Sequence, residues 1–263
     1  MSHFSPIQTI KETAKAIVPA YAWDRLKCAW LPVALRLWRD DLCRLAELCG
    51  TDKWGRHRYT THYQTHFAHL KSRSLNLLEI GVGGHDAPDI GGASLRMRKA
   101  FFPRANIYAI DIFDKSASQE PRISIFKGSA ADAVFLRSLV DRIGRIDIVI
   151  DDGSHINEHV RVAFETLFPL LPDGAIYAIE DLQTSYWPQF GGSEDPSNPD
   201  TSMAMLKRLA DGLNWEEFSH RTPQPFDSQI VSLNFYHNLA FIHKGQNNEG
   251  TNKGVVHTVH RDH

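Results

Sequence analysis

Residues 148–155 read Ile-Val-Ile-Asp-Asp-Gly-Ser-His, an apolar run that ends in two carboxylates, a glycine, a serine and a histidine. About one helix later the pattern recurs, because residues 175–181 read Ala-Ile-Tyr-Ala-Ile-Glu-Asp. Short apolar runs of this kind are typical of buried parallel strands. Two such strands would bring four carboxylates and one imidazole to the carboxyl edge of a sheet. In open α/β sheets, ligands bind at that edge.

Similar apolar runs alternate with helical patterns along the rest of the chain. The predicted strands are 75–81, 107–111, 123–127, 146–150 and 175–179, and the predicted helices between them are 94–102, 131–143 and 158–171. Strands that alternate with helices predict a parallel, doubly wound α/β sheet. Residues 230–233 and 239–243 predict an antiparallel pair of strands that closes this sheet.

Residues 1–50 form a helical N-terminal arm in this interpretation. Helices are predicted at 7–17, 21–38 and 40–49. Pro32 should interrupt the second of these, and Gly50 is placed to end the third. The arm is apolar around Trp30 and Trp38 and is bordered by basic residues. We expect it to pack on the domain or on a second subunit of a homo-oligomer, and peripheral contact with a membrane surface is the alternative.

The main domain is expected to span residues 51–245. Within it, residues 183–200 contain two adjacent glycines and three prolines, which predicts a mobile loop. Residues 246–263 are polar and are predicted to form a disordered tail.

Composition narrows the classes of partner. Hydrophobic residues make up 42% of the chain and charged residues 23%, which is ordinary for a soluble globular protein. The formal net charge of -2 gives no electrostatic footprint for nucleic acid, so no nucleic-acid partner is expected. The three cysteines lack a C-x-x-C spacing, and no apolar run reaches the length of about 18 residues that a transmembrane helix needs. We therefore expect a reduced, cytoplasmic protein.

Residues 79–84, Glu-Ile-Gly-Val-Gly-Gly, follow the first predicted strand. Glycines there let the backbone turn sharply and approach a ligand closely. A nicotinamide-binding fingerprint needs a further glycine where this chain has Asp86, which weakens a dehydrogenase interpretation. Glu79 could orient a cationic amino-acid group, and Asp111 at the end of the second strand could bind ribose hydroxyls. Together these two acids favour S-adenosylmethionine as the cofactor.

The acids that follow the later strands favour a metal ion. Hard oxygen ligands suit Mg²⁺, and His155 stands close enough to them to act as a base. A non-haem iron triad needs two histidines and one carboxylate, whereas this chain has one histidine with several carboxylates. The pattern therefore favours Mg²⁺ over iron.

Three further histidines, His62, His66 and His69, share one face of a helix predicted over residues 59–70. Histidines at this spacing could suggest zinc. No cysteine or acid stands at ligand spacing beside them, so we expect packing or contacts with a cofactor lid instead.

Several separated motifs occur in order along the chain. They are Thr51-Asp52-Lys53, His57, Tyr59-Thr60, His66-Phe67, residues 77–84, Gly91-Gly92, residues 94–97 and residues 151–155. Together they resemble the metal-dependent sugar O-methyltransferases, which include the macrolide deoxysugar enzymes of the mycinamicin and tylosin type. The resemblance extends to proteins labelled rhamnosyl O-methyltransferase or cephalosporin hydroxylase, although the ligand pattern argues against hydroxylation. It covers residues 51–181, and the macrolide enzymes carry a larger N-terminal domain than residues 1–50.

This resemblance implies a class I methyltransferase fold, a Rossmann-like seven-stranded sheet preceded by the helical arm. It also implies that Asp152, Glu180 and Asp181 bind Mg²⁺ and that His155 is the general base. The segment at Thr51 is expected to fold over S-adenosylmethionine. Adding the glycine loop, the strand ends and the turns after them, the residues expected to bind this cofactor are Thr51, Glu79, Gly81, Gly83, Ser94, Asp111, Gly128, Ser129 and Asp151.

The expected chemistry is methylation of a hydroxyl group. A sugar hydroxyl is a poor nucleophile because its pKa lies far above neutral, but a divalent cation lowers that pKa and an imidazole can remove the proton. We therefore expect an O-methyltransferase that acts on a hexose or deoxyhexose of a glycosylated natural product or glycolipid. The alternatives are methylation of a catechol-like molecule, which also offers a vicinal diol, and a sugar- or metal-binding protein without turnover.

Overall fold

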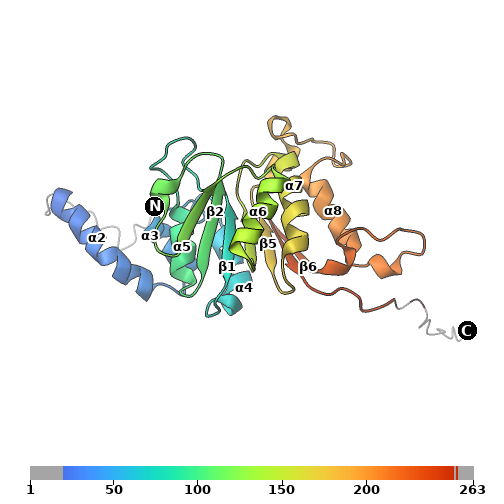
Figure 1. The fold of residues 1–263 in the computed structure, drawn as a ribbon, viewed down its shortest axis with the longest axis horizontal. Coiled ribbons are helices and arrows are strands. Elements are labelled where there is room, and N and C mark those ends of the chain that lie inside the picture. The colour runs from blue at the N-terminus through green and yellow to red at the C-terminus, as the bar shows by residue number, and fades with distance from the viewer. Residues whose placement is uncertain (1–19, 252, 254–263) are drawn as a thin grey trace, which may run out of the picture.

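The computed structural model describes residues 20–251 and residue 253, and Figure 1 shows a central sheet with helices packed against it. The seven strands have the order β3-β2-β1-β4-β5-β7-β6. They are β1 (Asn76–Ile80), β2 (Asn106–Asp111), β3 (Ile123–Lys127), β4 (Ile148–Asp151), β5 (Ile176–Ile179), β6 (Ile230–Tyr236) and β7 (Leu239–Lys244). The first five strands are parallel, and β7 runs antiparallel to both β5 and β6. The predicted sheet and its antiparallel pair are confirmed.

Helices cover the two faces of the sheet in separate groups. The main helices are α2 (Ala20–Leu37), α3 (Leu42–Cys49), α4 (Tyr59–Phe67), α5 (Ala93–Phe101), α6 (Ala133–Ile143), α7 (Asn157–Leu167) and α8 (Ser202–Gly212). Helices α3, α4 and α5 bury side chains such as Tyr63 and Phe101 in one hydrophobic core. Helices α6, α7 and α8 bury side chains such as Phe164 and Leu206 in the other. Removal of this apolar surface from water is the main force that holds the three layers together.

The strand order places the switch point of the sheet between β1 and β4. From β1 the chain winds outward to β2 and β3, and it then crosses back to β4 on the other side of β1. Ligands of open α/β sheets bind at such a reversal, beyond the carboxyl ends of the strands. The last pair of residues in register at this point is Ile80 and Asp151, so the glycine loop and the Asp-Asp-Gly-Ser-His stretch start side by side.

The N-terminal arm is helical, as predicted, and α2 projects from the main body at the side of the view in Figure 1. The interruption predicted near Pro32 is wrong, because α2 continues through this residue. A proline removes one backbone hydrogen bond, and here the helical bonds on either side of it keep the helix in one piece. Gly50 ends α3 in a left-handed conformation as predicted, and residues 7–17 lie outside the described residues. Among the described helices, none combines the length and apolar composition needed to cross a membrane.

The segment 183–200 differs from a plain loop. Two short 3-10 turns, Leu182–Tyr186 and Pro188–Phe190, shape its first half. The buried amide of Asn157 donates hydrogen bonds to the carbonyl oxygens of Thr184 and Phe190, at 3.1 and 3.0 Å. A side chain of α7 therefore anchors this segment beside β5, which glycine and proline content alone did not reveal.

The described part of the predicted tail, residues 246–251 and 253, makes hydrogen bonds with the domain. Trp215 Nε1 donates to the carbonyl oxygen of Asn247, and the Asn247 amide donates to the carbonyls of Leu213 and Asp227. Residues 252 and 254–263 lie outside the described residues.

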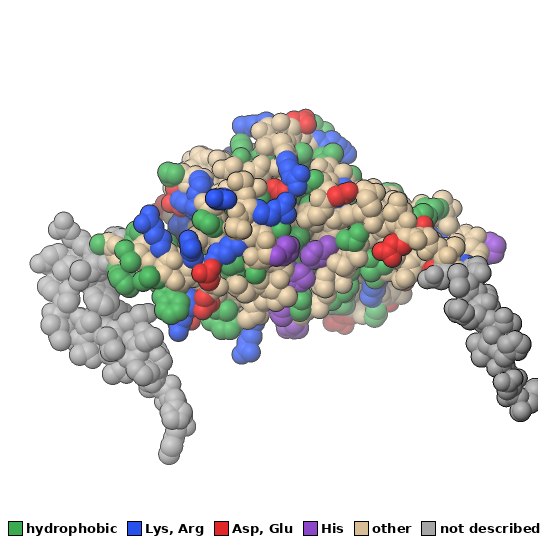
Figure 2. Space-filling model, turned by 90° about the horizontal axis from the view of Figure 1, so that it is seen from below, with side chains coloured by type: hydrophobic (Ala, Val, Ile, Leu, Met, Phe, Trp, Pro, Cys, Tyr) green, Lys and Arg blue, Asp and Glu red, His purple; other side chains and the backbone are tan. Residues whose placement is uncertain are grey.

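His66 lies in the core between α4 and the antiparallel strands. Its ring stacks on Phe241 with centroids 4.0 Å apart, and its ring nitrogens lie 3.0 Å from His243 Nε2 and 3.1 Å from the Tyr236 hydroxyl. Figure 2 shows histidine side chains gathered near the middle of the face seen from below. Burial lowers the pKa of His66 to about 4, and the neighbouring imidazoles, His243 first, lower it too. The packing role expected for His66 is confirmed.

This burial predicts acid sensitivity. The pKa of His66 is lower in the folded protein than in the unfolded chain, where about 6.5 is usual. The stability that neutral His66 contributes is therefore complete above about pH 6.5 and is lost as the pH falls toward 4. His66→Gln cannot titrate, so its unfolding free energy should fall by about 1–2 kcal/mol less than that of the wild type between pH 7 and 4.5. Urea unfolding at both pH values measures this, and exposed His220→Gln is the control; equal losses in all three proteins would contradict it.

Candidate active site at the carboxyl edge of the sheet

The backbone at the end of β1 is hydrogen-bonded to both neighbouring strands, to β2 on one side and to the residue after β4 on the other. The Gly81 N–H donates to the carbonyl oxygen of Ile110 at 2.8 Å, and the Asp152 N–H donates to that of Ile80 at 3.0 Å. Gly81 has a φ of +97°, and a Cβ at this residue would lie 2.2 Å from the Asp152 carbonyl oxygen. Only glycine fits there, because the two strand ends pack so closely.

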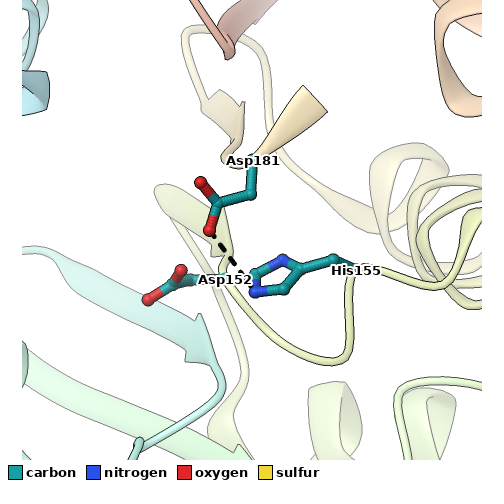
Figure 3. Close-up of side chains that lie close together, drawn as sticks. All are labelled: Asp152, His155 and Asp181. Carbon is teal, nitrogen blue, oxygen red and sulfur yellow. Dashed lines mark ion pairs between the residues drawn. The ribbon is translucent and has the colours of Figure 1, made fainter. Parts of the chain in front are cut away.

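Three of the predicted residues converge just beyond these strand ends. Asp152, His155 and Asp181 each offer a ligand atom, and these atoms all lie within 4.8 Å of one another. Figure 3 shows the side chains close together, with His155 Nε2 3.4 Å from Asp181 Oδ2. The side chains are 18%, 24% and 15% exposed, so the group is reachable from solvent. Two carboxylates beside an imidazole can hold a hard divalent cation.

The backbone of this group is strained at two residues. His155 and Asp181 have φ values of 57° and 53°, in the left-handed region that residues other than glycine rarely adopt. Such a conformation costs about 1–3 kcal/mol per residue and persists only where the surroundings enforce it. Strain at two residues that face each other is typical of a functional site.

Asp181 is held by several neighbours. Its Oδ1 accepts hydrogen bonds from the Tyr59 hydroxyl at 2.8 Å and from Gln183 Nε2 at 3.1 Å, and His57 Nδ1 lies 3.9 Å away. Burial alone would raise the pKa of Asp181, but the hydrogen bond from Gln183 and the neighbouring His155 lower it overall. Gln183 Oε1 is buried and has no hydrogen-bond partner among the described residues. A hydroxyl group or the water of a hydrated ion beside Asp181 would donate a hydrogen bond to this oxygen. Asp181 and Gln183 therefore fit a ligand of this kind.

Glu180 is buried beside this group and is bonded to interior residues. It is 2% exposed, and its Oε1 accepts hydrogen bonds from the Tyr63 hydroxyl and from Arg98 Nη2. Its Oε2 lies 2.5 Å from Lys53 Nζ. The left-handed backbone of Asp181 directs its carboxylate toward Tyr59 and His155, whereas the Glu180 carboxylate is bonded to Tyr63, Arg98 and Lys53. The sequence prediction grouped both acids as metal ligands, whereas here Glu180 is bonded to buried cations.

Lys53 links the predicted metal ligands to the segment before α4. Its Nζ lies 2.6 Å from Asp152 Oδ2 as well as 2.5 Å from Glu180 Oε2, and its side chain is 6% exposed. Burial lowers the pKa of Lys53, but the charges of Glu180 and Asp152 raise it by more, so the ammonium group keeps its proton. The sequence includes Lys53 in the Thr51-Asp52-Lys53 motif but gives no sign that its side chain pairs with these acids.

Glu79 and Ser94 meet in the interior rather than at the surface. The Glu79 carboxylate accepts hydrogen bonds from Ser94 Oγ at 2.5 Å and from Arg98 Nε. Glu79 is fully buried and Ser94 is 7% exposed. The acid that was expected to orient a cofactor amino group is therefore already paired with a cation of α5.

Asp151 is also buried. It is 3% exposed, and its Oδ2 accepts a hydrogen bond from the Tyr177 hydroxyl at 3.5 Å. Burial raises the pKa of Asp151 to about 7. The sequence prediction assigned this residue to the cofactor side; the register of β4 turns it toward α6 and α7.

Gly83 lies in the loop after β1, and Asp111 lies at the end of the neighbouring strand β2. Gly83 has a φ of +80°, and no atom lies within 4 Å of a Cβ built there, so the loop faces open space. The Asp111 carboxylate is partly exposed and accepts hydrogen bonds from the N–H groups of Val82 and Phe113, at 3.0 and 2.9 Å. Open space beside a backbone-anchored carboxylate fits a ligand with ribose hydroxyls.

The remaining predicted cofactor residues have evident local roles. Gly128 donates its N–H to the Asp111 carbonyl at 2.8 Å, and a Cβ there would lie 2.2 Å from the Phe135 ring. The hydroxyl of Ser129 accepts a hydrogen bond from the turn before α6. Thr51 is partly exposed directly after α3. Gly128 thus packs closely against Phe135, and Ser129 stabilises the turn before α6.

Two open hollows lie beside the antiparallel turn at His237 and Asn238. One, of about 520 Å³, is lined by Arg56, His57, Arg58, Tyr59 and His62 together with that turn. The other, of about 430 Å³, is mainly apolar and includes Leu182, Tyr186, Met203 and Phe235. Because His57 and Tyr59 also contact Asp181, the first hollow adjoins the candidate metal site.

The close contact at Gly81 gives a testable prediction. Gly81→Ala should lower the unfolding free energy by about 2–4 kcal/mol, because the new Cβ would collide with the Asp152 backbone. Gly83→Ala is the matched control, since it has a similar φ but open space, and it should cost only about 1 kcal/mol. Chemical denaturation measures the unfolding free energy of both variants. An equal decrease in the two would show that the left-handed backbone, and not the collision with Asp152, causes the loss of stability.

Comparisons with known proteins find relatives of the chain, although no family model matches it. The chain is 51% identical over 209 residues to the 8-demethyl-8-alpha-L-rhamnosyl tetracenomycin-C 2'-O-methyltransferase of Streptomyces olivaceus, covering 78% of this chain and 55% of that protein. It is 48% identical over 229 residues to the demethylmacrocin O-methyltransferase of Streptomyces fradiae, covering 85% of this chain and 57% of that protein.

A solved structure shows the same likeness. MycE methyltransferase from the mycinamycin biosynthetic pathway, in complex with Mg, SAH and mycinamycin VI, matches with a TM-score of 0.78 and 48% identity, covering 80% of this chain and 55% of that one. The chain thus spans about half the length of the curated relatives it matches. Over the part that it spans, the chain is a homologue of the sugar O-methyltransferases of the mycinamicin, macrocin and tetracenomycin type, and it has their class I methyltransferase fold.

Proposed function

We propose that the chain is an S-adenosylmethionine- and Mg²⁺-dependent O-methyltransferase that methylates a hydroxyl of a sugar in a glycosylated natural product or glycolipid. The observation that carries the proposal is the group of Asp152, His155 and Asp181 at the switch point of the sheet. It lies beside the glycine loop in a chain homologous to sugar O-methyltransferases.

The cofactor is assigned to the open side of the glycine loop. Gly83 and Asp111 supply the open backbone and the carboxylate there, and Thr51 stands partly exposed after α3. The solved MycE complexes hold SAH, the form of this cofactor without its methyl group, together with Mg. Glu79, Ser94 and Asp151 would support this site from inside the protein rather than touch the ligand.

The metal is assigned to the carboxylates of Asp152 and Asp181. When bound, a divalent cation supplies Lewis-acid activation of the acceptor hydroxyl. The protein contributes the fixed position of both carboxylates, since hydrogen bonds from Tyr59 and Gln183 orient Asp181. Gln183 Oε1 offers a further acceptor on the same side.

His155 is assigned the role of general base. Methyl transfer to a hydroxyl releases one proton, and His155, whose side chain is 24% exposed beside Asp181, would accept it. Burial lowers the pKa of His155, and the nearby Asp181 only partly offsets this, so the imidazole is neutral at neutral pH. A neutral imidazole can take a proton, and Asp181 then stabilises the charge that forms.

The acceptor is assigned to the two hollows beside His237 and Asn238. A sugar in the hollow of Arg56 and Arg58 would meet hydrogen-bond donors close to Asp181. The apolar hollow near Tyr186 and Phe235 would suit the rest of a glycosylated natural product or a lipid. A catechol would bind the metal at Asp152 and Asp181 but would leave the apolar hollow empty. Methylation of catechols is therefore the second candidate function.

The N-terminal arm supports a homo-oligomer. Trp30, Leu37 and Trp38 are exposed on or directly after α2, at 58%, 64% and 47%. Apolar side chains of this size are typical of a surface that another copy covers, and peripheral contact with a membrane surface is the alternative.

The proposal predicts metal-dependent methyl transfer. The full chain, incubated with radiolabelled S-adenosylmethionine, Mg²⁺ and a panel of glycosylated polyketides, glycolipids and catechol, should label a glycoside and lose that activity on addition of EDTA. Labelling of catechol alone would favour the second candidate. Cofactor binding without methyl transfer to any acceptor would indicate a binding protein without turnover and would contradict the proposal.

The role of His155 as general base predicts that its replacement lowers turnover without weakening cofactor binding. His155→Asn should lower kcat at least about a hundredfold, because proton removal is lost, while the Kd for S-adenosylhomocysteine stays within about twofold. Asparagine tolerates the left-handed backbone of this residue, so the substitution tests the imidazole rather than the strain. His159→Asn, which removes an imidazole on α7, is the control. Loss of cofactor binding in His155→Asn, or an unchanged kcat, would rule out the assigned role.

A further inference from the structure

The buried contacts of Lys53 carry an inference about how this site takes up a metal, and it rests on the proposed Mg²⁺ dependence. Lys53 Nζ lies between Asp152 Oδ2 and Glu180 Oε2, at 2.6 and 2.5 Å, and its side chain is 6% exposed. Both carboxylates belong to the set that the sequence predicts as metal ligands. The ammonium group therefore stands where a cation shared by these two acids would stand.

Charge explains why this lysine is needed in the absence of metal. Asp152 and Glu180 are close enough to share one ammonium group, and two unneutralised carboxylates in a buried place strongly repel each other. Arg98 cannot compensate both, because its guanidinium is paired with Glu79 and reaches Glu180 only at 3.4 Å. Lys53 supplies the missing positive charge.

The same charge opposes a metal. A divalent cation on Asp152 would stand next to the Lys53 ammonium, and like charges at such a distance in a poorly solvated site repel strongly. Asp152 comes directly after β4 and Glu180 directly after β5, both anchored in the sheet by backbone hydrogen bonds. Lys53 lies instead in the turn segment 51–58 between α3 and α4, which is outside the regular elements and is the more easily moved partner.

We propose that Lys53 holds the place of a cation between Asp152 and Glu180 in the metal-free protein, and that Mg²⁺ binding expels it. Expulsion frees Glu180 Oε2, so that this acid joins Asp152 and Asp181. It also moves the segment 51–58, which carries Thr51 and lines the hollow at Arg56 and His57. Metal binding and the shape of the cofactor- and acceptor-binding segment are thereby coupled through one side chain.

The test is chemical labelling of lysine amines, read by peptide mass spectrometry. The full chain is acetylated briefly with acetic anhydride in EDTA or in saturating MgCl₂. Lys53 should be protected in EDTA and should be labelled in MgCl₂ to about the extent of exposed Lys127. Lys244, whose ammonium group donates to the carbonyl oxygens of Phe168 and Pro169 in the interior, is the matched control and should stay protected in both.

Calorimetric titration with MgCl₂ gives the second measurement. Lys53→Met and Lys53→Gln should bind Mg²⁺ about tenfold more tightly than the wild type, because nothing has to be expelled. Adding Glu180→Gln to Lys53→Met should remove this gain, since the freed ligand is then lost. Lys244→Met should bind like the wild type.

The outcomes separate this inference from the proposed function. Continued protection of Lys53 at saturating MgCl₂ would overturn the inference and leave Asp152 and Asp181 as the proposed metal ligands, with methyl transfer intact. Weaker Mg²⁺ binding by both Lys53 variants would overturn it as well. No Mg²⁺ binding by any protein would overturn it together with the metal requirement, whereas methyl transfer itself is decided by the EDTA assay.

Discussion

The carboxyl edge of the sheet depends on two buried cations. β1, β4 and β5 each deliver an acid to the same small volume, namely Glu79, Asp152 and Glu180. A buried carboxylate without a partner costs several kcal/mol, so buried Glu79 and Glu180, with the partly buried Asp152 beside them, would destabilise the fold if they were unpaired. Lys53 and Arg98 remove that cost through ion pairs with all three.

Strand alternation decides which acids end up inside and which end up at the surface. Ile148 and Ile150 face the layer of α3–α5, and Val149 faces the layer of α6–α8. Continuing this alternation sends Asp151 toward Tyr177 and the second layer, and sends Asp152 toward Lys53 and the first. Adjacent acids in the sequence are thus separated by the sheet.

Asp181 does not follow the strand alternation, because its backbone has a left-handed φ. Alternation would turn it away from the side that holds Tyr59, but its left-handed φ redirects the side chain toward the Tyr59 hydroxyl and His155. The strain at Asp181 and His155 is therefore what brings the reactive group together. Sequence patterns reveal periodicity but not such a local reversal, so the motif could not show that Asp181 lies beside His155 while Glu180 is bonded to buried cations.

The same distinction explains how far the sequence could predict the fold and the site. Apolar period and turn residues located β3 at its observed bounds and Gly50 at the end of α3, because these depend on local chemistry. The ion pairs of Lys53 join residues 99 and 127 positions apart, and no local pattern encodes them. Glycines show the limit most clearly. Gly81 is required by a backbone contact, whereas Gly83 faces open space, although both stand in one motif. A glycine motif therefore identifies the turn, and the space around each glycine identifies the side on which a ligand can lie.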